Sequence, residues 1–417
     1  MKNPAFLLVI SNENNGTLFL MLKVFIVAGG EIHVIVCFGN IFCFLQTGLN
    51  MESNNITWWP VNNSGNMNSS YLNNHTIYPV YIFTPAGDTA KSVLCSILLA
   101  VGSVGFLGNC LVFYFLCQKT TSTPFQMSRF MRNLNLYIRS LSLSDLLSCL
   151  VSLPLLCIQI FFDVFQSGWP CKIVRYFHFI FPAITMNNLI VINVEKYLST
   201  RAFPRTFSSV TVRKMIVSAW VLGIVVMVIP AAAYDGIKVD LNQTHFTVIC
   251  RNGQNFYPFK IALVIFPIQY IFPSVLVIYM NICLSRTVWT KGKRRIDNAA
   301  SNASKAKNTA ARIKGTSLLI AVTFAFTIPY LLFVTNVAYT QIAKPKRGFA
   351  TDFITRYAAG ATAYCSSVIN FILYFAQMKD FREFLKKVLL RSRTGTDAAE
   401  QPEIFTFLRT ERLQKTN

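Results

Sequence analysis

Seven long apolar segments, separated by shorter polar ones, dominate the chain. They lie at about 92–117, 136–162, 173–198, 213–233, 257–284, 315–338 and 353–376. Each is near or above the roughly 20 residues that an α-helix needs to cross a lipid bilayer. The pattern therefore predicts an all-α fold, a seven-transmembrane helix bundle that occupies residues 91–391.

A shorter amphipathic pattern follows the seventh segment. Within the stretch MKDFREFLKKVLL, apolar residues recur at helical spacing and basic residues occupy the other faces. The apolar positions are Phe381, Phe384, Leu385 and Val388. This stretch predicts a short amphipathic helix on the inner membrane surface. The polar residues 392–417 are expected to form a disordered cytoplasmic tail.

The chain before the first segment divides into two parts. Residues 51–90 are polar and rich in asparagine, which predicts a glycosylated extracellular tail. Its glycosylation sequons begin at Asn55, Asn62, Asn68 and Asn74. Residues 1–50 contain an apolar run that ionisable residues interrupt. Three interpretations stay open for it: a signal sequence, a further membrane segment, or an extension upstream of a natural start at Met51, which we favour.

Composition supports a membrane protein, because 53% of the residues are hydrophobic and only 13% are charged, against about a quarter charged in soluble domains. The net charge of +22 is not gathered in one patch, so nucleic acid is not an expected partner. Basic residues cluster in 286–314 and 379–393, which places these segments in the cytosol when residues 51–90 lie outside. The distribution predicts a multi-pass plasma-membrane protein with an extracellular N-terminus and a cytoplasmic C-terminus.

The sequence gives little support to catalysis or metal chemistry. The eleven cysteines include no CxxC pair, and the four histidines are scattered. Neither HExxH nor GxSxG occurs, so we expect no enzyme and no cofactor beyond an allosteric ion. A membrane transporter is a more distant alternative, but internal repeats are not visible and Asp145 is the only acid expected at mid-membrane after Met51.

Polar or otherwise distinctive motifs recur in five of the apolar segments. They are Gly108-Asn109, LSLSDLL with Asp145, Glu195-Lys196-Tyr197, Trp220, and Asn370 followed by Tyr374. In this order and spacing, over about residues 90–390, the chain resembles the rhodopsin-like (class A) G-protein-coupled receptors. The resemblance implies a receptor that binds an extracellular ligand and activates a heterotrimeric G protein through a conformational change of the bundle.

The resemblance also implies roles for particular residues. A disulfide would join Cys171 to Cys250, whose loop also carries a glycosylation sequon at Asn242. Activation and G-protein coupling would involve a set near the cytosolic end, namely Glu195, Lys196, Tyr197, Asn281 and Tyr374.

A sodium ion is implied at the middle of the bundle. It would bind Asp145, with further oxygen ligands from Thr185, Ser366, Ser367 and Asn370. The alternative is a neutral Asp145 that is only hydrogen-bonded between helices.

Four positions depart from the family pattern. Lys196 stands in place of the usual arginine, and Phe371 in place of the usual proline after Asn370. The aromatic residue expected two positions before Pro329 is Thr327, so its role is missing or has moved to Phe324 or Phe326. Asn281 replaces a tyrosine, with Tyr279 close by. These departures concern activation and not the fold.

The candidate ligand pocket lies near the outer ends of the segments. Its residues are His178, Phe179, Tyr330, Arg356 and Tyr364. His178 stands where aminergic receptors carry an aspartate, and Tyr364 where opsins carry the retinal-bearing lysine, so amines and retinal are disfavoured. A packing role for His178 stays open. The aromatic and mildly basic lining predicts a peptide ligand; an acidic lipid, another small molecule, or a diverged receptor that does not signal are the alternatives.

Overall fold

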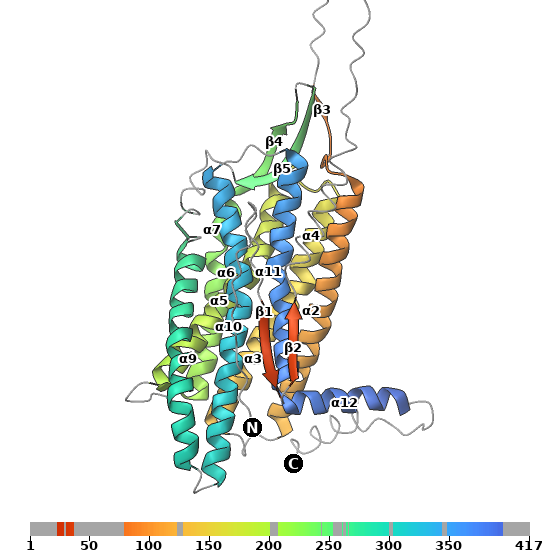
Figure 1. The fold of residues 1–417 in the computed structure, drawn as a ribbon. Coiled ribbons are helices and arrows are strands. Elements are labelled where there is room, and N and C mark those ends of the chain that lie inside the picture. The colour runs from red at the N-terminus through yellow and green to blue at the C-terminus, as the bar shows by residue number, and fades with distance from the viewer. Residues whose placement is uncertain are drawn as a thin grey trace, which may run out of the picture.

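The computed structural model describes most of the predicted bundle and its flanks. The described residues are 23–28, 31–36, 79–122, 128–200, 207–242, 244–252, 261, 264–265, 267–299, 303–343 and 348–394. Within them, seven helical spans are long and apolar enough to cross a membrane, and they pack side by side (Figure 1). The seven predicted spans are confirmed, with ends that differ by a few residues in six cases. The predicted start of the fifth span, at 257, lies outside the described residues.

The spans are built from single helices or from short helices in series. The first, third, sixth and seventh are α2 (Asp88–Ser122), α5 (Gly168–Thr200), α10 (Ala303–Ala343) and α11 (Phe349–Gln377). The second consists of α3 (Arg129–Leu147), the π-helical turn η1 (Ser148–Ser152) and α4 (Leu153–Phe161). The fourth consists of α6 (Ser209–Val226) and α7 (Val228–Ala232), and the fifth of the π-helical turn η2 (Pro267–Ile271) and α9 (Phe272–Ala299).

Proline accounts for the two π-helical turns. Pro154 comes two residues after the end of η1, and Pro273 two residues after the end of η2. A proline has no N–H to donate to the preceding turn, so the helix ahead of it widens locally. The widened turn η1 lies directly after Asp145 and its neighbours, and its residue Ser148 faces the central cavity of the bundle.

The third span is the centre of the bundle. In its most apolar stretch 78% of the residues are buried, against 28% in the fourth span. A helix enclosed in this way can present polar residues only to its neighbours, and α5 buries Thr185, Asn187, Asn188 and Asn193. Asn188 accepts a hydrogen bond from Ser140 of α3, at 3.1 Å. Polar contacts therefore help to fix α5 within the bundle.

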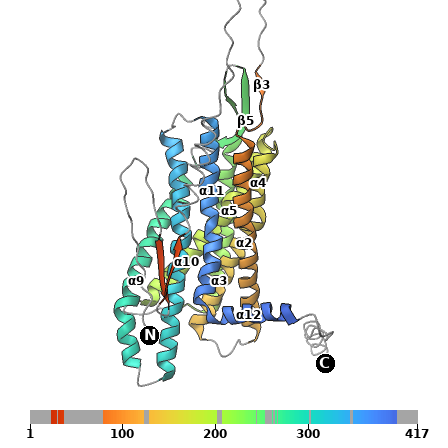
Figure 2. The same cartoon turned by 45° about the vertical axis from the view of Figure 1, so that its right-hand side comes forward.

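A small sheet covers one end of the bundle. β4 (Tyr234–Asp240) and β5 (His245–Asn252) are antiparallel, and β3 (Val80–Tyr81) pairs in parallel with β5, so the strand order is β3-β5-β4 (Figures 1 and 2). A disulfide ties β5 to α5 through Cys250 and Cys171. We call this end the disulfide end. The sheet adds a β element to a fold that the apolar pattern predicts as all-α.

The opposite end carries a helix that runs across the bundle. α12 (Lys379–Thr394) turns away from the end of α11 and runs across the end of the bundle in both views (Figures 1 and 2). Phe381 is fully buried, and its ring lies 5.4 Å from that of Phe115 in α2, between ring centroids. Lys119 of α2 pairs with Asp380. The helix is therefore docked on α2, and we call this end the α12 end.

Two further strands lie in the first fifty residues. β1 (Lys23–Ala28) and β2 (Glu31–Val36) pair antiparallel, with Lys23 opposite Val36. They fall within the apolar run for which three interpretations stay open. The remaining residues of 1–50 lie outside the described part of the chain.

The departure at Phe371 is explained by its packing. The Phe371 ring lies against the backbone of α2 at Gly108, where an added Cβ would come within 2.4 Å of the ring carbon Cγ. Gly108 therefore allows α2 and α11 to approach closely around this ring.

We expect Gly108→Ala to lower the unfolding temperature of the purified protein, because the methyl group would displace the Phe371 ring. Overpacking of this kind costs about 1–3 kcal/mol. Fluorescence-detected thermal unfolding in detergent measures the effect. Gly360→Ala is the matched control, since its Cβ would meet no atom closer than 3.8 Å. Equal unfolding temperatures for the two variants would contradict this account of the α2–α11 contact.

Candidate functional site

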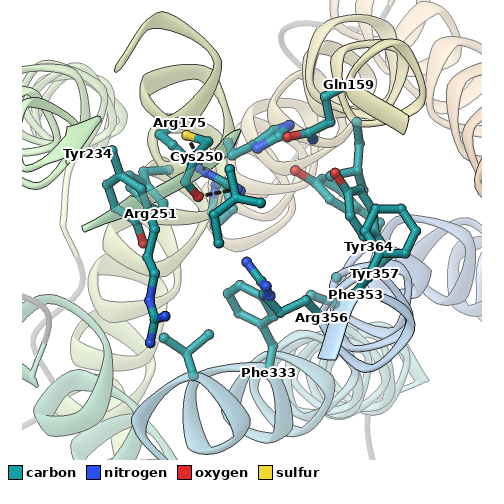
Figure 3. A pocket seen from close by; sticks show the side chains of 18 of the residues that line it. Gln159, Arg175, Tyr234, Cys250, Arg251, Phe333, Phe353, Arg356, Tyr357 and Tyr364 are labelled. Carbon is teal, nitrogen blue, oxygen red and sulfur yellow. Dashed lines mark hydrogen bonds between the residues drawn. The ribbon is translucent and has the colours of Figure 1, made fainter. Parts of the chain in front are cut away.

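A cavity of about 180 Å³ lies inside the disulfide end of the bundle (Figure 3). It extends from the strand β5, at Arg251 and Asn252, to the buried carboxylate of Asp145. Helices α4, α5, α10 and α11 supply most of its walls, and Phe83 and Thr84, just after β3, contribute as well. The cavity thus connects the covered end of the molecule with the middle of the bundle.

All five residues predicted for the ligand pocket line this cavity. They are His178, Phe179, Tyr330, Arg356 and Tyr364. The His178 ring is buried, and its Nε2 donates a hydrogen bond to the carbonyl oxygen of Ser152, at 3.1 Å. The ring therefore has a hydrogen-bond partner within the bundle and also faces the cavity. This geometry agrees with a packing role and with a role in contacting a ligand.

Stacked aromatic rings form one wall of the cavity. Phe326 lies nearly parallel to Tyr330, with ring centroids 5.3 Å apart, and the ring of Tyr270 is tilted against that of Tyr330, with centroids 5.0 Å apart. Thr327 is fully buried and its hydroxyl has no hydrogen-bond partner among the described residues. Of the two aromatic residues considered as replacements for the missing one, Phe326 lines the cavity and Phe324 is not among its walls.

Three lining residues escaped the sequence analysis. Arg175 of α5, Arg251 of β5 and Gln159 of α4 all face the cavity (Figure 3). A signal for the two arginines exists in the sequence. Arg251 directly follows Cys250, and Arg175 comes one helical turn after Cys171, so a bond between the two cysteines brings both arginines to one place.

The disulfide implied by the resemblance is present. Cys171 and Cys250 are bonded, with their Cα atoms 5.5 Å apart. Arg175 donates hydrogen bonds to both Sγ and the carbonyl oxygen of Cys250, each at 3.4 Å, and its guanidinium lies 5.3 Å from the centre of the Tyr234 ring. Burial raises the pKa of the Tyr234 hydroxyl, and the positive charge of Arg175 acts in the opposite direction.

The far end of the cavity holds the residues implied for a sodium ion. Asp145 is buried and accepts hydrogen bonds from Ser367, at 3.2 Å, and from Asn370, at 2.8 Å. Thr185 shares a hydrogen bond of 2.9 Å with Ser144, and Ser366 donates to the carbonyl oxygen of Ala363 at the same distance. Asp145, Thr185, Ser366 and Ser367 line the cavity, and Asn370 lies beside the carboxylate.

The donor set fits a small hard cation in its chemistry. One carboxylate, three hydroxyl oxygens and one amide oxygen are the ligand types that such ions take. The amide oxygen Oδ1 of Asn370 is buried without a hydrogen-bond partner among the described residues. The same contacts also satisfy Asp145 by hydrogen bonds alone, so the structure is compatible with both alternatives from the sequence.

At the α12 end, Glu195 and Lys196 form a buried pair. Only 3% of the Lys196 side chain is exposed, and its Nζ lies 3.2 Å from Glu195 Oε2. Asn133 of α3 donates to the other carboxylate oxygen, at 2.9 Å. The ammonium also sits 4.4 Å from the centre of the Phe130 ring and 5.6 Å from that of Tyr137. Both rings belong to α3, so the pair holds α5 against α3.

This pair belongs to a larger polar network. Ser209 at the start of α6 donates to Asn133, at 2.8 Å, and accepts from Arg132, at 2.7 Å. The network therefore joins α3, α5 and α6. From α10, the guanidinium of Arg312 approaches the Phe130 ring at 5.6 Å.

Two of the other predicted activation residues, Asn281 and Tyr374, are not bonded to Lys196. Asn281 of α9 and Tyr374 of α11 are fully buried, and Tyr197 is half-buried. Asn281 donates to the carbonyl oxygen of Val277, one turn earlier, at 2.9 Å. Within the described part of the chain, no hydrogen bond or ion pair joins Asn281 or Tyr374 to Lys196. The structure thus brings together Glu195 and Lys196 but not the whole predicted set.

One predicted glycosylation site is described. Asn242 is exposed between β4 and β5, and its side-chain oxygen accepts from the backbone and the hydroxyl of Thr244, each at 3.0 Å. The sequons at Asn55, Asn62, Asn68 and Asn74 lie outside the described residues.

Comparison with known families agrees with this geometry. Residues 108–374, more than half of the chain, match the rhodopsin family of 7 transmembrane receptors. The chain belongs to this family. It is accordingly a multi-pass membrane receptor.

Similar rhodopsin-family receptors include several whose names identify a peptide ligand. Galanin receptor 2a of Danio rerio is 24% identical over 74% of this chain and 81% of its own length. Somatostatin receptor type 3 of Homo sapiens is 27% identical over 74% of this chain and 71% of its own length. Among solved structures, squid rhodopsin matches with a TM-score of 0.58 and 17% identity, over 76% of this chain and 90% of its own. The last comparison shows the common fold alone.

The contribution of the buried Glu195–Lys196 pair to the stability of this rhodopsin-family receptor can be measured. We expect Lys196→Met to destabilise the folded protein by about 3–5 kcal/mol, because it leaves the Glu195 carboxylate buried without its cation. The double variant Glu195→Gln/Lys196→Met should recover most of this loss. Thermal unfolding of the purified protein measures both effects.

Lys196→Arg is the matched control, because it keeps the charge and can stack on the same rings. Its unfolding temperature should stay close to that of the original chain. A double variant no more stable than Lys196→Met alone would contradict the assignment of the pair as coupled.

Proposed function

We propose that this receptor resides in the plasma membrane, binds a peptide at the disulfide end and activates a heterotrimeric G protein at the α12 end. The observation that carries the proposal is that one and the same cavity extends from the sheet to Asp145. A ligand held near the sheet would be in contact with the walls of the same cavity that encloses the polar centre of the bundle. This is the arrangement that a receptor needs to convert binding into a change of helix packing.

Two features favour the orientation. A disulfide persists in an oxidising compartment, so the disulfide end would face the outside of the cell. The α12 end carries Lys386 and Lys387 on the exposed side of α12, opposite the buried Phe381. These lysines would meet the anionic inner leaflet and let α12 lie along it, so membrane lipid would be a partner.

Three observations favour a peptide ligand. The walls combine aromatic rings with arginine and amide side chains, which suits a ligand with both apolar side chains and polar backbone groups. The sheet over the cavity mouth offers backbone groups beside these walls. Galanin receptor 2a, somatostatin receptor type 3 and the allatostatin-A receptor of Bombyx mori, which are named after peptides, are also among the similar receptors.

α5 would transmit the signal, because one helix carries residues of all three sites. His178 and Phe179 line the cavity, Thr185 belongs to the polar centre, and Lys196 holds the α12 end against α3. A ligand shifts such a bundle only if it binds one arrangement more tightly than the other. Release of Lys196 from Glu195 and Phe130 would then open the end to which the G protein binds.

Sodium would act at the polar centre as an allosteric ion. Asp145 would supply the charge, and Thr185, Ser366, Ser367 and Asn370 the remaining oxygens. A bound cation would hold α3, α5 and α11 together and so favour the arrangement without agonist.

We expect a peptide to drive G-protein dissociation in cells that express the full chain. The measurement is a panel of energy-transfer sensors, one for each Gα class, challenged with a synthetic peptide library and, in parallel, with acidic lipids. Cys171→Ser should lower the response strongly, because it releases β5 from α5, whereas Cys110→Ser, at an exposed cysteine of α2, is the matched control. If only the acidic lipids produce a response, the ligand is an acidic lipid and not a peptide. If no sensor responds to any compound, the receptor does not signal through a G protein.

The sodium site predicts a second measurable dependence. Agonist affinity should fall when sodium chloride replaces choline chloride at equal ionic strength, and Asp145→Asn should abolish this difference. Radioligand competition with the agonist found above measures it. Unchanged sodium dependence in Asp145→Asn would leave only the hydrogen-bonded role for this carboxylate.

A further inference from the structure

The disulfide end of the cavity carries more positive charge than its acidic groups balance. Arg175, Arg251 and Arg356 line it from three different elements, with Asp352 as the only carboxylate at this end of its described walls (Figure 3). The other lining carboxylate, Asp145, belongs to the far end. Three arginines against one aspartate leave an excess of two positive charges beside a partly enclosed space.

Two of these arginines have no acidic partner in the described part of the chain. Arg356 pairs with Asp352, one turn earlier in α11. No described carboxylate lies within ion-pair distance of Arg175 or Arg251. The hydrogen bonds from Arg175 to Cys250 are long, at 3.4 Å, so most of the donors of its guanidinium group remain available.

The positive charges of two of these arginines also act on the hydroxyl group of Tyr234, at the start of β4. Tyr234 is half-buried and packs against Arg175 and Phe179. Burial raises the pKa of its hydroxyl, while the charges of Arg175 and Arg356 both act to lower it. Two guanidinium groups from different helices are therefore close enough to one hydroxyl to act on it together.

A separate observation also indicates a ligand in this cavity. Gln159 of α4 is only 3% exposed, and neither the nitrogen nor the oxygen of its side-chain amide has a hydrogen-bond partner among the described residues. It faces the cavity (Figure 3). A buried amide without partners is unfavourable, and a ligand that supplies a donor and an acceptor would satisfy it.

We infer that this cavity binds a ligand anchored by an oxyanion, most simply a carboxylate, which Arg175, Arg251 and Arg356 hold, and whose body presents an amide to Gln159. The inference rests on the proposed receptor function and names the ligand class. The planar guanidinium group matches a carboxylate through two parallel hydrogen bonds. Phe353 and Tyr357, whose rings are 4.5 Å apart between centroids, line the same space and suit an apolar or aromatic body.

Two matched pairs of probes test this chemistry directly. They are N-acetyl-L-phenylalanyl-L-phenylalanine with its C-terminal amide, and dodecanoate with dodecanamide. The full chain is purified into nanodiscs of zwitterionic lipid, and each probe is titrated while the unfolding temperature is recorded. We expect each acid to bind about tenfold or more tightly than its amide, because the charge-assisted hydrogen bonds are lost. The pair with the larger difference identifies the source, a peptide terminus or a fatty acid.

Variants at the arginines and at Gln159 assign the contacts. Arg251→Gln and Arg356→Gln should each weaken binding of the acids about tenfold and leave the amides unaffected. Lys238→Gln is the matched control, since it removes a positive charge from β4 at the same end but outside the cavity walls. Gln159→Leu should raise the unfolding temperature of the ligand-free protein, because it removes a buried amide without partners. It should also weaken binding of the acetylated dipeptide, but not binding of dodecanoate, which has no amide.

Several results would overturn the inference. They are equal affinities for acid and amide, no binding of any probe by a normally folded protein, an effect of Lys238→Gln as large as that of the arginine variants, or no effect of Gln159→Leu on the dipeptide. Its failure is distinct from that of the proposed function. A peptide agonist that is indifferent to the arginine variants would remove the oxyanion and keep the receptor function. Binding of the acids without any G-protein response would keep the oxyanion site and remove the proposed signalling function.

Discussion

The covalent bond between Cys171 and Cys250 is the constraint on which the ligand end depends. It fixes β5 to the first turn of α5, and the hairpin of β4 and β5 then lies over the cavity. Arg251 is attached to one half of this bond, and Arg175 lies one turn below the other half. Without the bond, the hairpin would keep its short pairing with β3 and its main-chain connection to α7, but it would lose its covalent link to α5, and the conformational entropy of the loop would rise.

Within the bundle, the need to satisfy polar groups away from water has a similar effect. Asp145 bonds to two residues of α11, and Glu195 bonds to Asn133 of α3 and to Lys196 beside it. Each group left without its partner would be costly in lipid surroundings, so these contacts restrict how the helices can slide or rotate. Thr185 of α5 also bonds to Ser144 beside Asp145, so the polar centre and the Lys196 pair restrain the same helix α5 at different depths.

Much of the fold could be predicted from the sequence because the membrane imposes a simple rule. A span needs a long apolar run, and seven such runs gave the seven helices. The predicted pocket residues all line one cavity, because the resemblance to the receptor family already indicated which positions of the spans face inward near the outer end. The disulfide pair and the position of Asp145 followed from the motif pattern.

The remainder depended on contacts between distant segments. Gln159 belongs to an apolar run and gives no sign in the sequence that its amide lacks a partner. The position of Lys196 beside Phe130 requires the packing of α3 on α5. The pairing of β3 with β5 joins residues more than 160 positions apart, and two residues in a polar tail do not identify a strand. Neither local propensity nor hydropathy encodes such pairings.

One consequence of the β3 pairing concerns α2. At the disulfide end, the backbone of Val80 and Ile82 is hydrogen-bonded to the chain around β5, and only a short link with a left-handed bend at Thr84 separates this strand from the start of α2 at Asp88. At the other end, Phe115 and Lys119 hold α12. α2 is thus held at both of its ends, by the sheet at one and by α12 at the other. A displacement of the sheet must therefore bend the link between Ile82 and Asp88, which is on the order of 20 Å long when fully extended, or tilt α2 as a whole. In the second case the contacts of α2 with α12 move as well.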